Sequence, residues 1–119
     1  MVSTEPPARP GGKMNEFVQI STTTDKREEA EKISRLLVEQ RLAACVQIVG
    51  PVHSTYWWKD QVEQAEEWQL LIKTKETMFE RVKELIRTNH SYDVPEILLV
   101  PITDGSEDYL EWLDENLTD

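Results

Sequence analysis

The stretch "LAACVQIVGPVHSTYWWKDQVEQAEEWQLLIKTK", residues 42–75, decides the fold. Strand character runs over about 44–59 and resumes over 62–74, whereas a typical strand has about 5 to 6 residues. Gly50-Pro51 marks a bulge or bend in the first arm, because proline removes a hydrogen-bond donor from the ladder. Asp60 lies in the tip and can tolerate a positive φ. The stretch therefore predicts one long β-hairpin.

The flanking segments predict the other elements by their hydrophobic periodicity. A strand begins at Phe17 and is expected to end at the polar run 21–24, and a helix follows that ends near Arg41. After the hairpin come a helix ending at Asn89, a strand over 97–102 that is apolar on both faces, and a last helix capped by Ser106. The order is βαββαβ with a C-terminal helix, an α+β sandwich of the ferredoxin-like kind.

Two pairs of residues predict where the longer helices begin. Asp25 followed by Glu28 is an acidic variant of the capping box, and Thr77 with Glu80 repeats the pattern. We therefore expect both helices to start with side-chain caps.

Composition narrows the class of protein. The 119 residues include 13 basic and 23 acidic side chains, and the net charge of -10 argues against nucleic-acid or anionic-membrane surfaces. Cys45 is the only cysteine and no apolar run approaches the roughly 20 residues of a membrane span, so we expect a cytoplasmic protein. We expect residues 1–13, rich in proline and glycine, to be a disordered tail, and residues 14–119 to form one domain that needs no metal to fold.

The length of the hairpin implies partners. Arms of roughly fifteen residues span about 50 Å at about 3.3 Å per residue, so they must extend beyond a sheet of this size. The arms carry Tyr56, Trp57, Trp58 and Trp68, and such an edge, if left bare, would pair without control. We expect closed oligomerisation through the hairpin; the alternative is a hairpin folded back at Gly50-Pro51.

One cluster of titratable residues precedes the strand over 97–102. His90, Asp93 and Glu96 offer imidazole and carboxylate donors that suit zinc, copper(II) or nickel. The structural alternative is that His90 caps the preceding helix while Glu96 pairs with a lysine.

A second set of residues could line a ligand cleft. Glu67 and Lys73, six residues apart on one arm, point to the same face and could hold charged groups beside Tyr92. A plain ion pair between them is an equal alternative. Trp58 is a further candidate for this cleft, although packing is its favoured role, and Cys45 is favoured as a buried, inert thiol.

Nothing in the sequence nominates an enzymatic reaction. A nucleophile elbow, a CxxC pair, a glycine-rich phosphate loop and an HExxH motif are all absent. We therefore expect a binding or structural protein.

Five motifs in matching order resemble the CutA family of divalent-cation tolerance proteins, over residues 14–117. The motifs are "RLAACVQI" (41–48), "STYWW" (54–58), "EEWQLLIKT" (66–74), "HSYDVPEI" (90–97) and "YLEWL" (109–113). The resemblance implies a trimer similar in architecture to PII signalling proteins, with clefts between subunits. It implies a non-enzymatic protein that binds or senses metal, with a structural or signalling adaptor that binds no metal as the alternative.

Three departures from the family pattern bear on metal binding. The family usually has His-Pro-Tyr-Glu where this chain has 90–93, so Ser91 loosens the backbone and Asp93 shifts a ligand oxygen. Asp60 replaces a tip glycine. Ser21 stands where some relatives carry cysteine, which weakens a copper(I) site because copper(I) favours sulfur.

Overall fold

The structure is a computed structural model that describes residues 16–118. The expected disordered tail, residues 1–13, lies outside the described residues. The elements, in chain order, are β1 (Phe17–Thr24), α1 (Arg27–Glu39), β2 (Cys45–Trp58), β3 (Gln61–Lys75), the 3-10 turn η2 (Glu76–Met78), α2 (Phe79–Asn89), β4 (Leu98–Pro101) and α3 (Glu107–Glu115).

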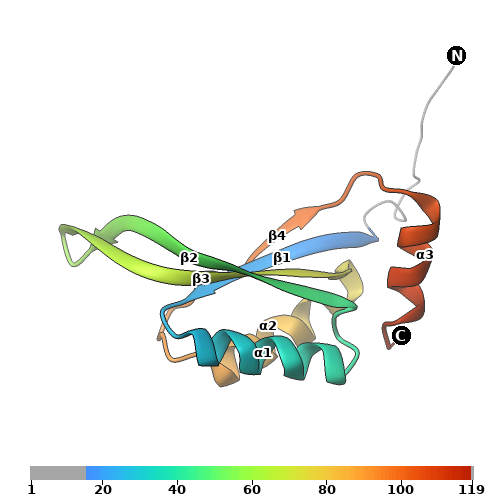
Figure 1. The fold of residues 1–119 in the computed structure, drawn as a ribbon, viewed down its shortest axis with the longest axis horizontal. Helices are drawn as coiled ribbons and strands as arrows, with labels where there is room; N and C mark the ends of the chain where they lie inside the picture. Colours follow the sequence, from blue (N-terminus) through green and yellow to red (C-terminus); the bar gives the residue numbers. More distant parts are fainter. Residues whose placement is uncertain (1–15, 119) are drawn as a thin grey trace, which may run out of the picture.

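The four strands form one antiparallel sheet in the order β2-β3-β1-β4 (Figure 1). Helices α1 and α2 lie side by side against one face of the sheet, and α3 lies at the end opposite the hairpin tip (Figure 1). The predicted α+β, ferredoxin-like architecture is confirmed, and it fits the PII-like description.

The hydrophobic core fills the space between the sheet and the two helices. Ile20 of β1 pairs with Ile72 of β3 on one side and Leu99 of β4 on the other, so the central strands present a continuous apolar surface. The helices cover it with side chains at helical spacing. The fully buried apolar residues include Val18, Ile20, Ala30, Ile33, Leu37, Leu70, Ile72, Val82 and Ile86.

The long hairpin is confirmed in detail. Strands β2 and β3 remain paired out to Trp58 and Gln61, well beyond the helices (Figure 1). Lys59 and Asp60 form the two-residue turn with φ values of 51° and 64°, as expected for this tip. The register shifts between Val49 and Val52, at the predicted Gly50-Pro51 bend.

The glycine at this bend has a packing reason. A Cβ at position 50 would lie 2.5 Å from Cδ1 of Trp68, so any larger side chain collides with the indole. Trp68 in turn packs against the core. The bend therefore sets how the hairpin leaves the body of the sheet.

The predicted capping boxes were wrong. The residues at the N-caps are Lys26 for α1 and Met78 for α2, and neither side chain caps its helix. Asp25 instead pairs with Lys26 at 3.4 Å. Ser106 is the N-cap residue of α3, as expected, but makes no side-chain capping hydrogen bond.

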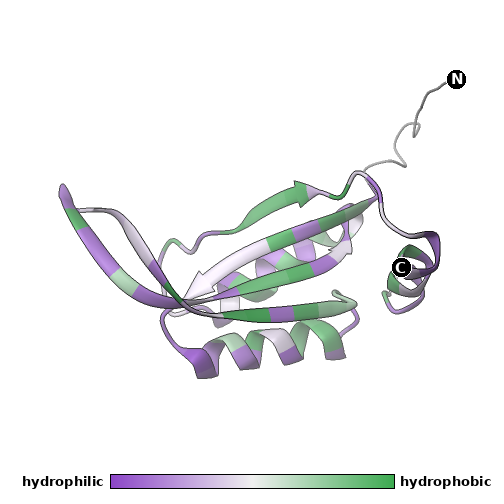
Figure 2. Cartoon of the chain, turned by 45° about the horizontal axis from the view of Figure 1, so that its top comes forward, coloured by the Kyte–Doolittle hydropathy of each residue, from purple (hydrophilic) through white to green (hydrophobic). Residues whose placement is uncertain are grey.

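Strands β1 and β4 also differ from expectation. The threonines that were expected to end β1 continue it, because Thr22 and Thr24 are fully buried and their backbones pair with β3. Strand β4 is hydrophobic along its length (Figure 2) but is an edge strand with Leu98 and Val100 more than half exposed. The strand carries apolar residues on both faces, as expected, but one of these faces is exposed in the single chain.

Among residues 16–118, no helix is long and apolar enough to cross a membrane.

Candidate ligand pocket

One open pocket lies where the hairpin leaves the body of the sheet. Its volume is about 790 Å³, and its walls come from β2 and β3, from the end of β1 and from the loop between α2 and β4. The residues that line it are Thr23, Asp25, Ser54, Thr55, Tyr56, Trp58, Glu63, Ala65, Glu67, Ser91, Tyr92, Asp93, Val94 and Glu96.

Glu67 is the buried carboxylate of this pocket. Only 6% of the residue is exposed, although it follows a solvent-exposed stretch of β3. Ser54 Oγ donates a hydrogen bond to its Oε1 at 2.7 Å, and the Tyr92 hydroxyl donates to its Oε2 at 2.7 Å. Both donors are neutral, and Glu67 forms no ion pair with any residue that the structure describes. Its negative charge is therefore solvated by dipoles alone.

Tyr92 links the loop after α2 to the hairpin. Burial raises the pKa of its hydroxyl, and the hydrogen bond and negative charge of Glu67 raise it further. The phenol therefore stays protonated across the physiological range and remains a donor to Glu67.

His90 supports the pocket from beneath. Its side chain is fully buried, and it occupies the C-cap position of α2. The Tyr92 backbone N–H donates to Nδ1 at 3.0 Å, so Nε2 carries the ring proton and donates to the Thr23 carbonyl at 2.8 Å. Both ring nitrogens are engaged, and the imidazole holds the loop against β1.

Glu29 completes this support and was missed from the sequence. Its Oε2 accepts hydrogen bonds from Thr24 Oγ1 at 2.7 Å, from the Ser91 N–H at 3.1 Å and from Ser91 Oγ at 3.3 Å. Burial raises the pKa of Glu29, but the hydrogen bonds from Thr24 and Ser91 and the nearby His90 outweigh it, so the net pKa is lowered. Ser91, expected to loosen the loop, is instead tethered by two bonds, and a proline could not donate the backbone one.

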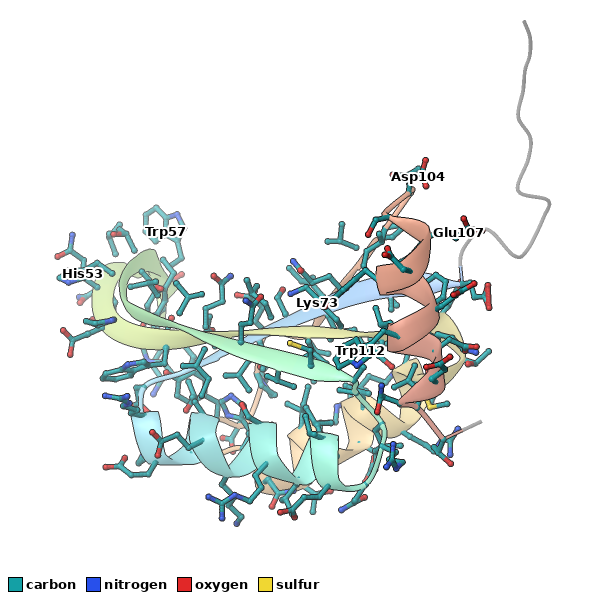
Figure 3. All side chains as sticks on the ribbon, turned by 45° about the vertical axis from the view of Figure 1, so that its right-hand side comes forward. His53, Trp57, Lys73, Asp104, Glu107 and Trp112 are labelled. Atoms are coloured by element: carbon teal, nitrogen blue, oxygen red, sulfur yellow. The ribbon has the colours of Figure 1, made fainter. Side chains whose placement is uncertain are left out.

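The structure brings five predicted site residues to one pocket and leaves two outside it. Those that line it are Trp58, Glu67, Tyr92, Asp93 and Glu96. His90 is buried between the loop after α2 and strand β1 and does not line the pocket. Lys73 is six residues along β3 from Glu67, about 20 Å away, and its Nζ bonds Gln47 Oε1 at 2.6 Å. Figure 3 shows Lys73 far from the hairpin end that Trp57 and His53 mark.

The alternatives for these residues are also resolved. Glu67 and Lys73 form neither a shared cleft nor an ion pair in one chain, because each has its own partners. Trp58 is 57% exposed and does not pack into the core, and Cys45 is half-buried.

The donor groups of one chain do not form a closed metal site. Within residues 16–118, no three His, Cys, Asp or Glu side chains are placed so that they could hold a metal ion together. Asp93 and Glu96 reach the pocket, but the buried ring of His90 is committed to backbone partners. A three-ligand site built from His90, Asp93 and Glu96 does not fit this arrangement.

Comparison with known proteins identifies the family. The family model described as CutA1 divalent ion tolerance protein matches residues 18–116, which include all strands and helices except the first residue of β1, and all residues that line the pocket. The chain belongs to the CutA1 family.

Relatives in this family come from distant organisms. The divalent-cation tolerance protein CutA of Thermus thermophilus is 45% identical over 103 residues, which are 87% of this chain and 98% of the relative. The chloroplastic protein CutA of Arabidopsis thaliana is 42% identical over 81% of this chain, but this chain spans only 53% of that relative's length. None of these proteins is named as an enzyme.

Solved CutA1 structures share the fold. The crystal structure of CutA1 from Oryza sativa superposes with a TM-score of 0.86 at 34% identity, covering 89% of this chain and 97% of that one. The ferredoxin-like architecture is thus a property of the family.

Proposed function

We propose that this CutA1 family member is a non-enzymatic, cytoplasmic homotrimer that binds a divalent cation, copper or zinc, at the acidic pocket and so senses metal. The observation that carries the proposal is the excess of negatively charged side chains in the pocket lining. No Lys, Arg or His is among the residues that line the pocket. Five carboxylates do line it, those of Asp25, Glu63, Glu67, Asp93 and Glu96. Such a site attracts cations, and carboxylate oxygens bind divalent ions.

The proposed ligands are the two exposed carboxylates of the loop, Asp93 and Glu96. Because no three ligands come together within residues 16–118 of one chain, water completes the coordination, and binding is expected to be exchangeable rather than structural. His90 becomes a ligand only if its Nδ1 releases the Tyr92 N–H. The metal is accordingly cargo or signal, with no part in folding.

The exposed aromatic end of the hairpin supports assembly into an oligomer. Tyr56, Trp57 and Trp58 are 42%, 73% and 57% exposed on a ribbon that no helix of the same chain covers. A neighbouring subunit would cover Trp57, the most exposed of the three, which does not line the pocket, and would leave the pocket faces of Tyr56 and Trp58 to a ligand. The number three comes from the resemblance to PII-like trimers. Light scattering should give three times the 13.9 kDa of one chain.

Calorimetric titration with copper(II) and zinc tests the metal proposal. We expect saturable binding in the wild type that weakens at least tenfold in Asp93→Asn/Glu96→Gln. Glu66→Gln/Glu111→Gln is the matched control, because it removes the same charge from two exposed positions outside the pocket. An absence of saturable heat in the wild-type trimer would contradict direct metal binding.

The aromatic wall favours a second candidate function. Tyr56, Trp58 and Tyr92 line the pocket, and a hydrated metal ion would not require contacts with aromatic rings. A small-molecule adaptor of PII-like architecture that binds no metal would use them.

A further inference from the structure

The pocket is larger than a metal ion needs. Its volume of about 790 Å³ lies within the roughly 300–1,000 Å³ typical of sites for organic ligands. A single hydrated cation would leave most of this space to bulk water. The size therefore points to a ligand with a carbon framework.

The charge in the pocket is distributed rather than concentrated at one point. Glu67 lies on β3 in the body of the hairpin, Glu63 lies closer to its tip, and Asp93 and Glu96 belong to the opposite loop. Because no cationic side chain lines the pocket, this charge is available to a ligand. Separated carboxylates suit a ligand with several separated positive charges.

Glu67 is the strongest single indication of a cation. It is 94% buried, it faces the pocket, and among residues 16–118 its carboxylate accepts hydrogen bonds only from the hydroxyls of Ser54 and Tyr92. A buried carboxylate is usually paired with a cation, since neutral dipoles replace hydration incompletely. A ligand ammonium would supply the missing charge.

The hairpin already displays the second contact that such a ligand would use. Lys59 Nζ lies 5.6 Å from the ring centre of Trp58, a cation-π contact between a primary ammonium and an indole that lines the pocket. Aromatic faces also cover methylene chains well. Tyr56 adds another ring on the same strand.

We propose that the pocket binds a linear aliphatic polyamine. One ammonium contacts Glu67, a second lies near the carboxylates of the loop, and the methylene chain covers the rings of Tyr56 and Trp58. This inference rests on the proposed function in one respect, namely that the acidic pocket is the ligand site. It differs in the class of ligand, since the carbon chain contributes to binding.

Calorimetry on the full-length protein with spermidine and 1,8-diaminooctane tests the proposal. Both should bind saturably, while 1,8-octanediol, of the same length but neutral, should not. Glu67→Gln should weaken binding at least tenfold, whereas the matched control Glu66→Gln, an exposed neighbour outside the pocket, should not. Trp58→Ala should weaken binding and Trp57→Ala should leave it unchanged, provided that light scattering shows the same mass for both.

A second variant guards against disruption of the buried hydrogen bonds. Glu63→Gln/Asp93→Asn removes two exposed charges and leaves the bonds of Glu67 intact. It should also weaken spermidine binding at least tenfold.

The outcomes separate the two proposals. If copper(II) or zinc binds saturably but the amines give no saturable heat and do not compete with the metal, the polyamine inference is overturned while metal binding stands. Amine binding that depends on Glu67, without metal binding, would support the inference and contradict the metal proposal. Amine binding that is equal in Glu67→Gln and Glu66→Gln would place the amines elsewhere and overturn the inference.

Discussion

Glu29 shows how a single carboxylate can organise a pocket that it does not line. It fixes Ser91 through two hydrogen bonds and lies 3.4 Å from the buried His90, which in turn orients Tyr92. Tyr92 then reaches across to Glu67. The loop after α2 is thus held at successive residues.

Replacing Glu29 with glutamine should destabilise the protein in a pH-dependent way. The pKa of Glu29 is lowered below its ordinary value of 4.5, so its carboxylate contributes stability that is fully present above that pH and is lost as the pH falls through the folded-state pKa. At pH 7 we expect Glu29→Gln to lower the free energy of unfolding by about 2 kcal/mol, because hydrogen bonds to a charged acceptor are lost. Chemical denaturation between pH 7 and pH 3 should show the difference narrowing below pH 4.5.

The neighbouring Glu28→Gln is the control, since it removes the same charge from an exposed position in the same helical turn. An equal effect of both substitutions at pH 7 would contradict the assigned role of Glu29.

At the scale of residues, the sequence was informative where functional groups lie close along the chain. Tyr92, Asp93 and Glu96 reach the pocket together because one loop carries them. Glu29 could not be foreseen, since its partner Ser91 is 62 positions away and helix-forming glutamates are common. Lys73 was misplaced because two side chains on the same face of a strand are not close to each other when they are six positions apart.

Among the elements, the turn of the hairpin is the clearest target. Lys59 and Asp60 both adopt positive φ, a conformation that destabilises a residue with a Cβ by roughly 1 kcal/mol. Asp60→Gly should therefore raise the melting temperature, by an amount equivalent to about 1 kcal/mol per chain.

Thermal denaturation at a fixed protein concentration measures the effect. Asp60→Ala, which removes the carboxylate but keeps the Cβ, serves as the control and should give no gain. A gain of equal size in both variants would show that charge rather than backbone conformation limits the turn.

The elements themselves could be predicted from periodicity, whereas their ends and exposure could not. At α1 the predicted capping box is replaced by a hydrogen bond between Thr24 and Glu29, which also binds the distant Ser91, a tertiary contact that local patterns do not contain. The apolar run of β4 predicted a strand apolar on both faces, but not that the strand lies at the sheet edge, where Leu98 and Val100 are exposed.

For the whole molecule, the part of the hairpin beyond the helices is the decisive feature. Replacing residues 55–64 with Asn-Gly keeps the Ser54 and Ala65 pair and the hydrogen bond from Ser54 to Glu67, but removes Tyr56, Trp57 and Trp58. We expect the shortened protein to lose trimer formation, because its exposed aromatic surface and shared strand edges are gone.

Light scattering should report the mass of one chain for the shortened protein, with Asp60→Gly as the control that keeps the wild-type mass. A trimer that survives the deletion would move the interface to the sheet face, where Leu98 and Val100 are exposed.

The same overhang bears on the order of events during folding. The helix-covered sheet has its own core, so it can collapse as a unimolecular step, but Trp57 and Trp58 near the tip stay more than half exposed within one chain. Amide protons near Trp57 should accordingly exchange with solvent much faster than those of Ile20 until subunits meet. For the proposed trimer, the final stage of folding is then a bimolecular reaction whose rate rises with protein concentration. Dilution alone would leave the hairpin frayed while the domain behind it remains folded.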